Sequence, residues 1–325
     1  MKQKVVLYHP VPEDVVELLS DNFELTVFEK VNSSNREAFI EAAHEAEGLI
    51  GMGLPIRTEL LAGAKRLQAI TTISAGYDSF DVGWLTNQKV LLMNLFDPLT
   101  ETTADLAFAL LMATARRIPE LDKRVRNGEW KNAVANEWFG SDIFGKTLGI
   151  VGMGRIGTAV ARRGALGCGM SILYTARTPK TEAERQLGAV RYELEHLLRE
   201  SDYVCIAIPL SAETTHLIGD NELKLMKKSS ILVNIARGPV VDEEALCRAL
   251  VDGTIHAAGL DVFEKEPLPM TSPLLSMENV VLAPHIGSAT QETRDSMSRY
   301  AAHSLVNYLV HGSPRNAVNP EVLQS

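Results

Sequence analysis

The sequence predicts an α/β protein made of two doubly wound parallel sheets, and three observations support this fold class. β-rich runs alternate with helical patterns from residue 4 to residue 93, and the same alternation restarts near residue 147. A glycine-rich turn follows the first strand of the second series directly. Strands that alternate with helices are typical of an open parallel sheet with helices on both faces.

The first series contains five runs that we expect to form strands, at 4–8, 24–28, 48–51, 69–73 and 90–93. The segments between them have helical patterns, at 12–20, 33–44, 57–61 and 81–86. Two longer helical patterns follow at 101–117 and 119–128. The first of these is apolar on most faces, so we expect it to lie buried between two bodies.

The second series contains six expected strands, at 147–151, 171–174, 203–208, 231–235, 257–262 and 280–283. Helical patterns lie between most of them, including 155–166 and 242–251, and a final helix is expected at 291–310. Asp242 is the expected N-cap of its helix, with Glu243 and Glu244 near the positive end of the helix dipole.

Length, charge and cysteine content exclude several classes of protein. The chain has 325 residues, which suggests about two domains, and 32 Lys plus Arg against 41 Asp plus Glu give a formal charge of −9. This negative net charge argues against a surface for nucleic acid or for an anionic membrane, since both require a basic patch. Its three widely spaced cysteines argue against a disulfide framework or a thiolate metal site. We therefore expect no metal site. Since the longest apolar stretch, 106–115, is about half as long as a bilayer-spanning helix must be, we expect a cytoplasmic protein.

A phosphate-binding turn is predicted at Gly152-Met153-Gly154-Arg155-Ile156-Gly157, between a strand and a helical pattern. Gly152 permits the tight turn, Gly154 lets the backbone approach a pyrophosphate, and Gly157 lets the helix pack closely on the strand. The helix N-terminus then offers unpaired N–H groups to the phosphates. The alternative is a tight structural turn without a ligand.

The end of the next strand bears on which dinucleotide is bound. An NAD site usually places Asp or Glu there to accept from the ribose 2′-hydroxyl. This chain has Thr175-Ala176-Arg177-Thr178 instead, and Arg177 suits the 2′-phosphate of NADP. We therefore expect NADP to be preferred, with NAD as the alternative. The competing interpretation of Arg177 is a solvated surface arginine.

Three ionisable residues, Arg237, Glu266 and His285, lie just beyond three consecutive expected strands. In open α/β sheets, ligands bind outside the carboxyl ends of the strands, so we expect these side chains to converge. An arginine fork suits a carboxylate, a histidine suits proton transfer near neutral pH, and a carboxylate beside the histidine favours its protonated form. Together they suit the reduction of a carbonyl by a nicotinamide.

Four segments together resemble the D-isomer-specific 2-hydroxyacid dehydrogenase family: Gly152–Gly157, Asn234–Pro239, Gly259–Pro267 and Pro284–Ser288. The similarity extends over nearly the whole chain. It implies a Rossmann nucleotide-binding domain at 100–289, inserted into a flavodoxin-like substrate domain made of 1–99 and 290–325, with the active site between them. It also implies a homodimer.

The resemblance assigns the catalytic roles to Arg237, Glu266 and His285. It implies that a larger set of residues contacts the dinucleotide: Thr103, Gly152, Gly154, Arg155, Ile156, Gly157, Arg177, Thr178, Pro209, Ile235, Ala236, Asp261 and Gly287. The expected substrate contacts are Met52, Gly53, Leu54, Ala75, Gly76, Trp138, Arg237 and His285. Among these, Ala75 and Gly76 match a loop whose N–H groups receive the substrate carboxylate. Trp138 matches an aromatic that some members lend across the dimer, and its alternative is an ordinary dimer-core tryptophan.

The expected reaction is the reduction of a small 2-keto acid to the D-2-hydroxy acid, with hydride from NADPH. Glyoxylate, hydroxypyruvate and 2-ketogluconate are co-candidates as the substrate. Formate is disfavoured, because formate dehydrogenases carry Gln where this chain has Glu266. Within the family, the alternatives are phosphite or another D-2-hydroxy acid. From a different class, the alternative is a dinucleotide-sensing binding protein on the same scaffold.

Overall fold

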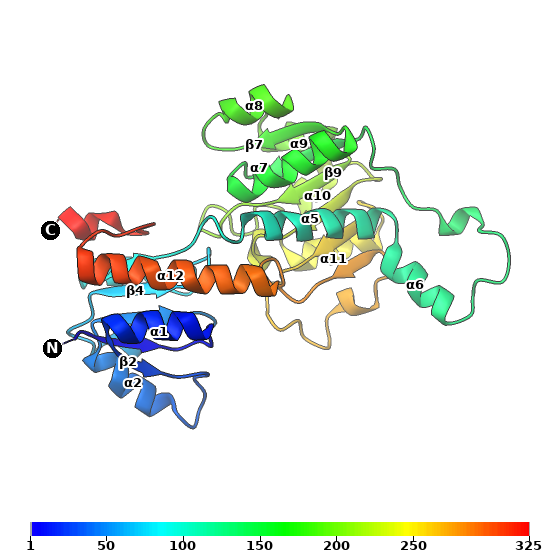
Figure 1. Cartoon of the computed structure of the whole chain (residues 1–325). Helices are drawn as coiled ribbons and strands as arrows, with labels where there is room; N and C mark the ends of the chain where they lie inside the picture. Colours follow the sequence, from blue (N-terminus) through cyan, green and yellow to red (C-terminus); the bar gives the residue numbers. More distant parts are fainter. Residues whose placement is uncertain (1, 325) are drawn as a thin grey trace. The chain divides into compact units, whose positions relative to one another are not determined.

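The computed structural model describes residues 2–324, which form two compact units (Figure 1). Unit 1 is the described part of Met1–Leu99 and Ser288–Ser325, and unit 2 is Thr100–Gly287. Unit 1 is therefore discontinuous in sequence. The second part of unit 1 begins at Ser288, whereas we expected it to begin at residue 290. Gly287 is the last residue of unit 2, and its N–H donates to the Asp261 carboxylate of that unit at 2.9 Å.

Unit 1 contains a five-stranded, all-parallel sheet in the order β2-β1-β3-β4-β5. The strands are β1 (Lys4–Leu7), β2 (Glu24–Val27), β3 (Gly48–Gly51), β4 (Ala69–Thr72) and β5 (Leu91–Met93). The helices are α1 (Glu13–Asn22), α2 (Arg36–Glu45), α3 (Thr58–Leu61), α4 (Val82–Asn87) and α12 (Gln291–His311), and a 3-10 helix spans Pro320–Gln324.

The C-terminal part of the chain completes unit 1. Helix α12 packs on β3 and β4, where a side chain at Gly48 would meet Leu305 and Leu309. Beyond α12, the Asn319 side chain accepts a hydrogen bond from the N–H of Leu92 at 2.8 Å and donates to the carbonyl of Val90 at 2.9 Å. The segment after α12 is thus hydrogen-bonded to β5 and the residue before it.

Unit 2 contains a seven-stranded, all-parallel sheet in the order β12-β11-β10-β9-β6-β7-β8. The strands are β6 (Thr147–Val151), β7 (Ser171–Thr175), β8 (Val190–Arg191), β9 (Tyr203–Ile206), β10 (Ile231–Asn234), β11 (Ala257–Leu260) and β12 (Val280–Leu282). The α-helices are α5 (Thr100–Ala115), α6 (Ile118–Arg126), α7 (Arg155–Arg162), α8 (Thr181–Leu187), α9 (Leu194–Glu200), α10 (Asp220–Leu225) and α11 (Glu243–Val251). Three 3-10 helices span Asn136–Trp138, Gly238–Val240 and Pro273–Ser276.

The strand order of unit 2 reverses next to β6, which lies between β9 and β7. Such a reversal is where open α/β sheets bind ligands. The central strands β9 and β10 are buried along their whole length, as parallel strands covered by helices should be. The sheet therefore presents the carboxyl ends of β6, β9, β10 and β11 along one edge.

The helices of unit 2 differ from the sequence-based expectations in two places. The helix expected at 155–166 is divided: α7 ends at Arg162, and a π-helical turn covers Arg163–Gly167. Helix α5 buries one face against β10, β11 and β12 and leaves Met112 on another face 45% exposed within the described structure. The N-cap prediction is confirmed, since Asp242 Oδ1 accepts from the N–H of Ala245 at 2.9 Å.

No helix among residues 2–324 combines the length and the apolar composition that a membrane crossing requires.

Candidate active site

His285 and Glu266 form a hydrogen-bonded pair at the carboxyl edge of unit 2. His285 Nδ1 lies 2.7 Å from Glu266 Oε2, and Glu266 Oε1 accepts from the N–H of Phe263 at 3.1 Å. The two residues follow β12 and β11, which are neighbours in the sheet. Because Nδ1 faces a carboxylate, the ring is oriented and Nε2 is the nitrogen that can exchange a proton with a substrate.

Opposing effects set the charge state of Glu266. Partial burial by itself raises the pKa of the carboxyl, but the hydrogen bonds from His285 and the Phe263 N–H and the charges of His285 and Arg237 outweigh it. The pKa of Glu266 is therefore lowered below its ordinary value of 4.5. An ionised Glu266 can only accept at Oε2, so His285 Nδ1 is the donor in this pair.

Asp261 holds the loop that carries His285. Its carboxylate is 1% exposed and accepts from the N–H groups of Ile286 at 2.7 Å and Gly287 at 2.9 Å. Its carbonyl accepts from the N–H of His285 at 2.9 Å. His285 itself has φ +56°, a left-handed conformation that a residue with a side chain adopts at a cost. These three bonds stabilise that conformation.

Burial raises the pKa of Asp261 above its ordinary value of 3.8, although the two N–H donors and the charge of His285 act in the opposite direction. Burial thus disfavours the charged carboxylate, and the two N–H donors offset part of that cost.

Arg237 is positioned by the turn that follows β10. The Asn234 amide donates from Nδ2 to the carbonyl of Arg237 at 3.1 Å and accepts at Oδ1 from the N–H of Ala236 at 3.0 Å. At Gly238, a side chain would overlap the backbone of Phe263, so the absence of one lets the Arg237 turn lie directly against the loop that leads to Glu266. The structure thus brings Arg237 within electrostatic reach of Glu266.

Asn234 is a positioning residue that sequence reasoning missed. It is 1% exposed and lies at the last position of β10. The signal was available, since an amide at the end of an otherwise apolar strand needs buried hydrogen-bond partners.

The glycine turn after β6 has the geometry expected of a phosphate-binding turn. Gly152 has φ +102°, and a side chain there would meet Ile208 and the carbonyl of Ala207. At Gly157, a side chain would overlap the carbonyl oxygen of Gly152. At Gly154, by contrast, a Cβ would have no atom within 4 Å, and no side chain caps the N-terminus of α7. The turn therefore leaves open space beside the N–H groups of the helix, which fits a pyrophosphate.

The loop after β7 has a cationic side chain and no acid. Arg177 is exposed, and its carbonyl accepts from Arg191 at 3.4 Å, but its guanidinium has no hydrogen bond or ion pair within residues 2–324. The pKa of Glu213 is lowered, mainly by the hydrogen bond from Ser211 and also by the charge of Arg177. Tyr174 keeps the loop in shape: its hydroxyl donates to Glu184 at 2.6 Å and accepts from the N–H of Lys180 at 2.8 Å. Thr178 lies exposed in the same loop.

The other expected dinucleotide contacts lie at the same edge of unit 2. A side chain at Gly287 would meet Thr103 at 3.2 Å and Asp261 at 3.4 Å, so these three residues adjoin one another. Ile235 and Ala236 are 7% and 8% exposed in the turn after β10. Pro209 follows β9, and its carbonyl accepts from the Thr214 hydroxyl at 2.8 Å. Arg155 and Ile156 form the first turn of α7.

In unit 1, the turn after β4 presents N–H groups. The carbonyls of Ser74, Ala75 and Gly76 accept hydrogen bonds from the Leu95 N–H at 3.0 Å, the Asn94 amide at 2.7 Å and the Ser74 hydroxyl at 2.6 Å. The N–H groups of Ala75 and Gly76 have no acceptor among the described residues. This arrangement suits a carboxylate. Buried Asn94 is a second positioning residue that sequence reasoning missed.

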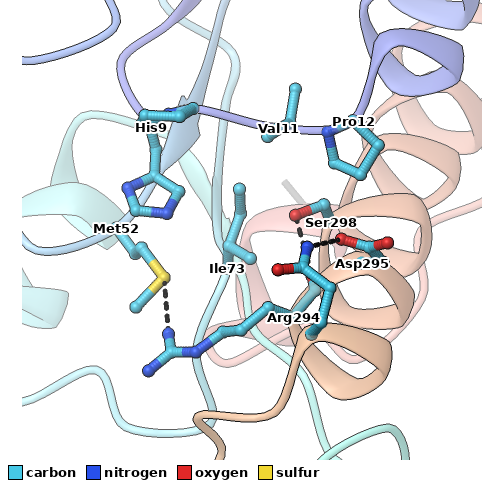
Figure 2. Close-up of a pocket in the computed structure, with 10 residues that line it drawn as sticks. His9, Val11, Pro12, Met52, Ile73, Arg294, Asp295 and Ser298 are labelled. Carbon is cyan, nitrogen blue, oxygen red and sulfur yellow. Dashed lines mark hydrogen bonds between the residues drawn. The ribbon is translucent and has the colours of Figure 1, made fainter.

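The Met52-Gly53-Leu54 segment follows β3 in the same unit. Gly53 has φ +75°, and the sulfur of Met52 accepts a hydrogen bond from Arg294 at 3.1 Å (Figure 2). Leu54 packs against the apolar core of unit 1.

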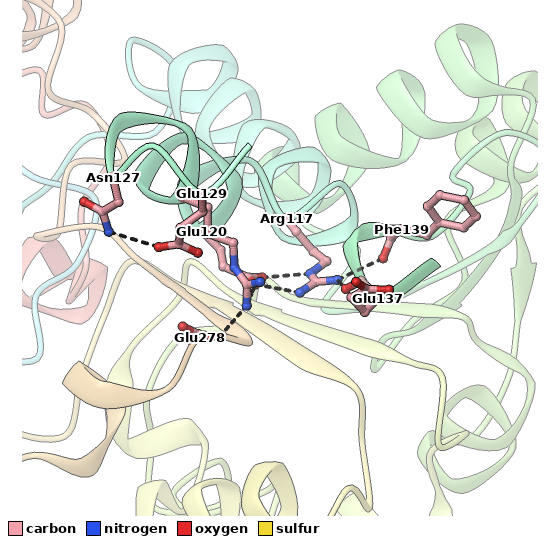
Figure 3. Close-up of polar contacts among 8 residues, drawn as sticks. Arg117, Glu120, Asn127, Glu129, Glu137, Phe139 and Glu278 are labelled. Atoms are coloured by element: carbon pink, nitrogen blue, oxygen red, sulfur yellow. Dashed lines mark hydrogen bonds and ion pairs between the residues drawn. The ribbon is translucent and has the colours of Figure 1, made fainter. Parts of the chain in front are cut away.

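Trp138 lies in the 3-10 helix Asn136–Trp138, close to two arginines. The Arg124 guanidinium lies 5.5 Å from the centre of the Trp138 ring. Arg117 donates to the carbonyl of Phe139, the next residue, at 3.2 Å (Figure 3). Glu120 joins the two arginines, at 2.6 Å from Arg117 and 3.0 Å from Arg124. The segment that contains Trp138 is thus held by Arg117 and Arg124 of the same chain.

Comparison with known proteins gives a consistent assignment. The family model described as D-isomer specific 2-hydroxyacid dehydrogenase, NAD binding domain, matches residues 108–287. Glyoxylate/hydroxypyruvate reductase B of Yersinia enterocolitica is 49% identical over 324 residues, covering 100% of this chain and 99% of that protein. The protein of the same name in Yersinia pestis is also 49% identical, over 323 residues, covering 99% of each chain.

Two solved structures are similar over nearly the full length. A glyoxylate reductase from Paecilomyes thermophila has a TM-score of 0.89 and 32% identity, covering 98% of this chain and 99% of that one. An NADPH-dependent glyoxylate/hydroxypyruvate reductase from Sinorhizobium meliloti, in complex with NADP and malonate, has a TM-score of 0.84 and 31% identity, covering 98% of this chain and 97% of that one.

Proposed function

Because the chain belongs to the D-isomer-specific 2-hydroxyacid dehydrogenase family, we propose that it is an NAD(P)-dependent oxidoreductase that reduces a small 2-keto acid to the D-2-hydroxy acid. The observation that carries this proposal is the 2.7 Å pair of His285 and Glu266, within electrostatic reach of Arg237. The same unit contains a turn that fits a dinucleotide. The relatives named as glyoxylate/hydroxypyruvate reductases support the same chemistry.

The residues present fit a nicotinamide dinucleotide. Gly154 and the start of α7 would hold its pyrophosphate, and Thr103, Asp261 and Gly287 would lie near its nicotinamide end. When bound in reduced form, the nicotinamide supplies the hydride. The remaining task of the protein is to bind and orient the keto acid and to supply a proton and compensating charge.

Arg237, Ala75 and Gly76 would bind the keto acid. The two N–H groups receive its carboxylate, and the guanidinium fork of Arg237 binds the carboxylate and polarises the keto oxygen. His285 then donates the proton of Nε2 to the developing alkoxide, and ionised Glu266 stabilises the imidazolium until the transfer. In the reverse direction, neutral His285 acts as the base.

NADP is the dinucleotide that we propose to be preferred. Arg177 supports this choice. It is a cationic side chain in a loop that contains no Asp or Glu, so it can bind the dianionic 2′-phosphate of NADP. The complex of the Sinorhizobium meliloti reductase with NADP points in the same direction.

The test is a panel of 2-keto acids assayed with NADPH and with NADH. We propose glyoxylate, hydroxypyruvate and 2-ketogluconate as substrates, ranked by kcat/KM because discrimination lies in that ratio. The expected result is turnover of at least one of them, faster with NADPH. A wild-type protein that reduces none of them with either dinucleotide refutes the proposed function, and equal or faster rates with NADH refute the NADP preference alone.

We also propose a homodimer. Large apolar side chains are exposed between residues 118 and 144, which is unusual for a free surface: Ile118 57%, Trp130 62%, Val134 53%, Phe139 59% and Phe144 80%. A second copy of this chain would cover them, and Trp138 lies in the same segment. Light scattering after gel filtration should give twice the 35.6 kDa of one chain, and a monomer would refute the dimer.

The compartment that we propose is the cytoplasm. All three cysteines, Cys168, Cys205 and Cys247, are free, as is usual in a reducing compartment.

A further inference from the structure

Arg191, on the edge strand β8, donates hydrogen bonds to the loop that carries Arg177. Its Nε lies 3.0 Å from the carbonyl oxygen of Ala176, and its Nη2 makes a longer bond, at 3.4 Å, to the carbonyl oxygen of Arg177. Strand β8 consists of Val190 and Arg191 alone. Two residues contribute little pairing to a seven-stranded sheet, whereas they place the Arg191 side chain beside the loop between β7 and α8.

The register of the sheet explains why Arg191 reaches these two carbonyls. Arg191 is paired with Tyr174 of β7, and the N–H of Tyr192 donates to the carbonyl of Tyr174 at 2.9 Å. Strand β8 ends at Arg191, so the carbonyls of Ala176 and Arg177 accept no main-chain hydrogen bond from residues 2–324. Because the two strands are parallel and each residue advances about 3.3 Å, a long side chain is needed to reach that far forward. The planar guanidinium can donate to both carbonyls at once.

The same loop is held at its other end by the Tyr174 hydroxyl, which accepts from the N–H of Lys180 at 2.8 Å. Between the two attachments, the side chains of Arg177 and Thr178 are exposed. Neither the Arg177 nor the Arg191 guanidinium is paired with a carboxylate of the described chain. The backbone under Arg177 is therefore fixed on both sides, while its guanidinium remains available to an anion.

We propose that Arg191 is a positioning residue that determines specificity for NADP. Its two bonds hold the backbone of Ala176 and Arg177 in one conformation, so the Arg177 side chain meets the ribose 2′-phosphate without the loop first having to be ordered. NADH has a hydroxyl in place of this phosphate, so its binding should not depend on Arg191. The inference rests on the NADP preference of the proposed function and adds a residue that acts through Arg177.

The test measures the dissociation constants of NADPH and NADH by fluorescence titration, which requires neither a keto acid nor turnover. Arg191→Met keeps an unbranched side chain but removes the donors. It should weaken NADPH binding about three- to ten-fold, the usual cost of ordering a mobile side chain on binding, and change NADH binding by less than about two-fold. Arg191→Lys keeps the charge and one donor group, so its loss should also be selective for NADPH but smaller.

The matched control is Arg199→Met, because this exposed arginine of α9 pairs with Glu195 at 3.5 Å and not with the loop. The ratio of the two dissociation constants should stay at the wild-type value in this variant. Since Arg191 is exposed, none of these substitutions should change the fold, and circular dichroism spectra check this.

A double-mutant cycle separates positioning from simple attraction between charges. If Arg191 acts through Arg177, Arg191→Met should weaken NADPH binding by less than about two-fold in a protein that already carries Arg177→Ala. If the charge of Arg191 attracted the phosphate by itself, the full loss would persist in that background.

Three results with the variants would overturn the proposal. These are equal losses for both dinucleotides in either Arg191 variant, wild-type affinity for NADPH in both variants, and the full additional loss in the Arg177→Ala background. A wild type that binds NADH as tightly as NADPH would overturn the NADP preference and this inference together. Failure of the proposed reduction is recognised separately, by a wild type that reduces no 2-keto acid, because the titrations do not depend on turnover.

Discussion

The backbone N–H of His285 donates to the carbonyl of Asp261 at 2.9 Å, which ties the proposed acid to the end of β11. The Asp261 carboxylate also accepts the next two N–H groups of the same loop. One buried residue thus positions the backbone of the loop that carries the imidazole. Asp261 was expected only as a dinucleotide contact, and the structure adds this positioning role.

Asp261→Asn should lower kcat while the fold persists. The amide has the same shape but one acceptor fewer, so either Ile286 or Gly287 loses a hydrogen bond and His285 shifts. We expect kcat to fall about ten- to a hundred-fold, with KM for the keto acid changed by less than about three-fold, since the carboxylate contacts of the substrate remain. Steady-state kinetics beside a circular dichroism spectrum measure both. The control is Asp252→Asn, an exposed aspartate after α11; a wild-type kcat in Asp261→Asn would contradict the positioning role.

The pH profile of keto-acid reduction should be flat on its acid side and respond to Glu266. Because the pKa of Glu266 is lowered, the carboxylate stays ionised as pH falls, and its effect on His285 is lost only below about 4.5. In Glu266→Gln the amide keeps the size of the side chain but has no carboxyl group to titrate, so kcat/KM should be lower and should no longer decline further on the acid side below about 4.5. Initial rates across the pH range of stability test this. A Glu266→Gln variant with the wild-type rates and the wild-type acid decline would show that Glu266 does not act in the reaction.

Two alanine substitutions in the glycine turn should have opposite consequences. Gly157→Ala forces a Cβ onto the carbonyl of Gly152 and should lower the free energy of unfolding by roughly 1–3 kcal/mol. Gly154→Ala meets no protein atom within 4 Å and should change stability by less than about 1 kcal/mol. It should instead weaken dinucleotide binding, because the new methyl group occupies the space left for the phosphates. Urea denaturation and dinucleotide fluorescence titration separate the two effects, and unaltered binding in Gly154→Ala would place the phosphates elsewhere.

Arg177→Ala should affect NADPH selectively. Removal of the guanidinium should raise KM for NADPH about ten- to a hundred-fold, the usual effect of losing a hydrogen bond to a charged group, and should change KM for NADH by less than about three-fold. Arg185→Ala is the control, since this exposed arginine of α8 pairs with Glu182 at 2.6 Å. Equal changes for both dinucleotides in Arg177→Ala would mean that the 2′-phosphate does not contact this residue.

Much of the fold could be predicted from the sequence, and the predicted fold class and family resemblance are confirmed. Most strands of both sheets were predicted because they are apolar runs, and the turn after β6 was predicted from the spacing of its glycines. Strand β8 was not predicted because Val190–Arg191 is short and exposed. The expected binding of a nicotinamide dinucleotide is supported at the level of the family, while the NADP preference, the homodimer and the roles of the individual site residues stay predictions.

The residues missed from the sequence position the backbone and were not expected to contact a ligand. Asn234 and Asn94 are polar residues at strand ends, as many are, and only their burial and their hydrogen bonds to turn carbonyls show that they hold the turns in place.

The turn at Ser74–Gly76 has one more consequence. Its proposed capacity to receive a carboxylate comes from peptide groups whose carbonyls are already engaged, and peptide N–H groups do not titrate at any pH at which the protein is folded. A receptor of this kind neither gains nor loses a proton over the pH range in which the protein is folded. Capture of the ionised acid group by this turn is therefore independent of the group that supplies the proton for the reaction.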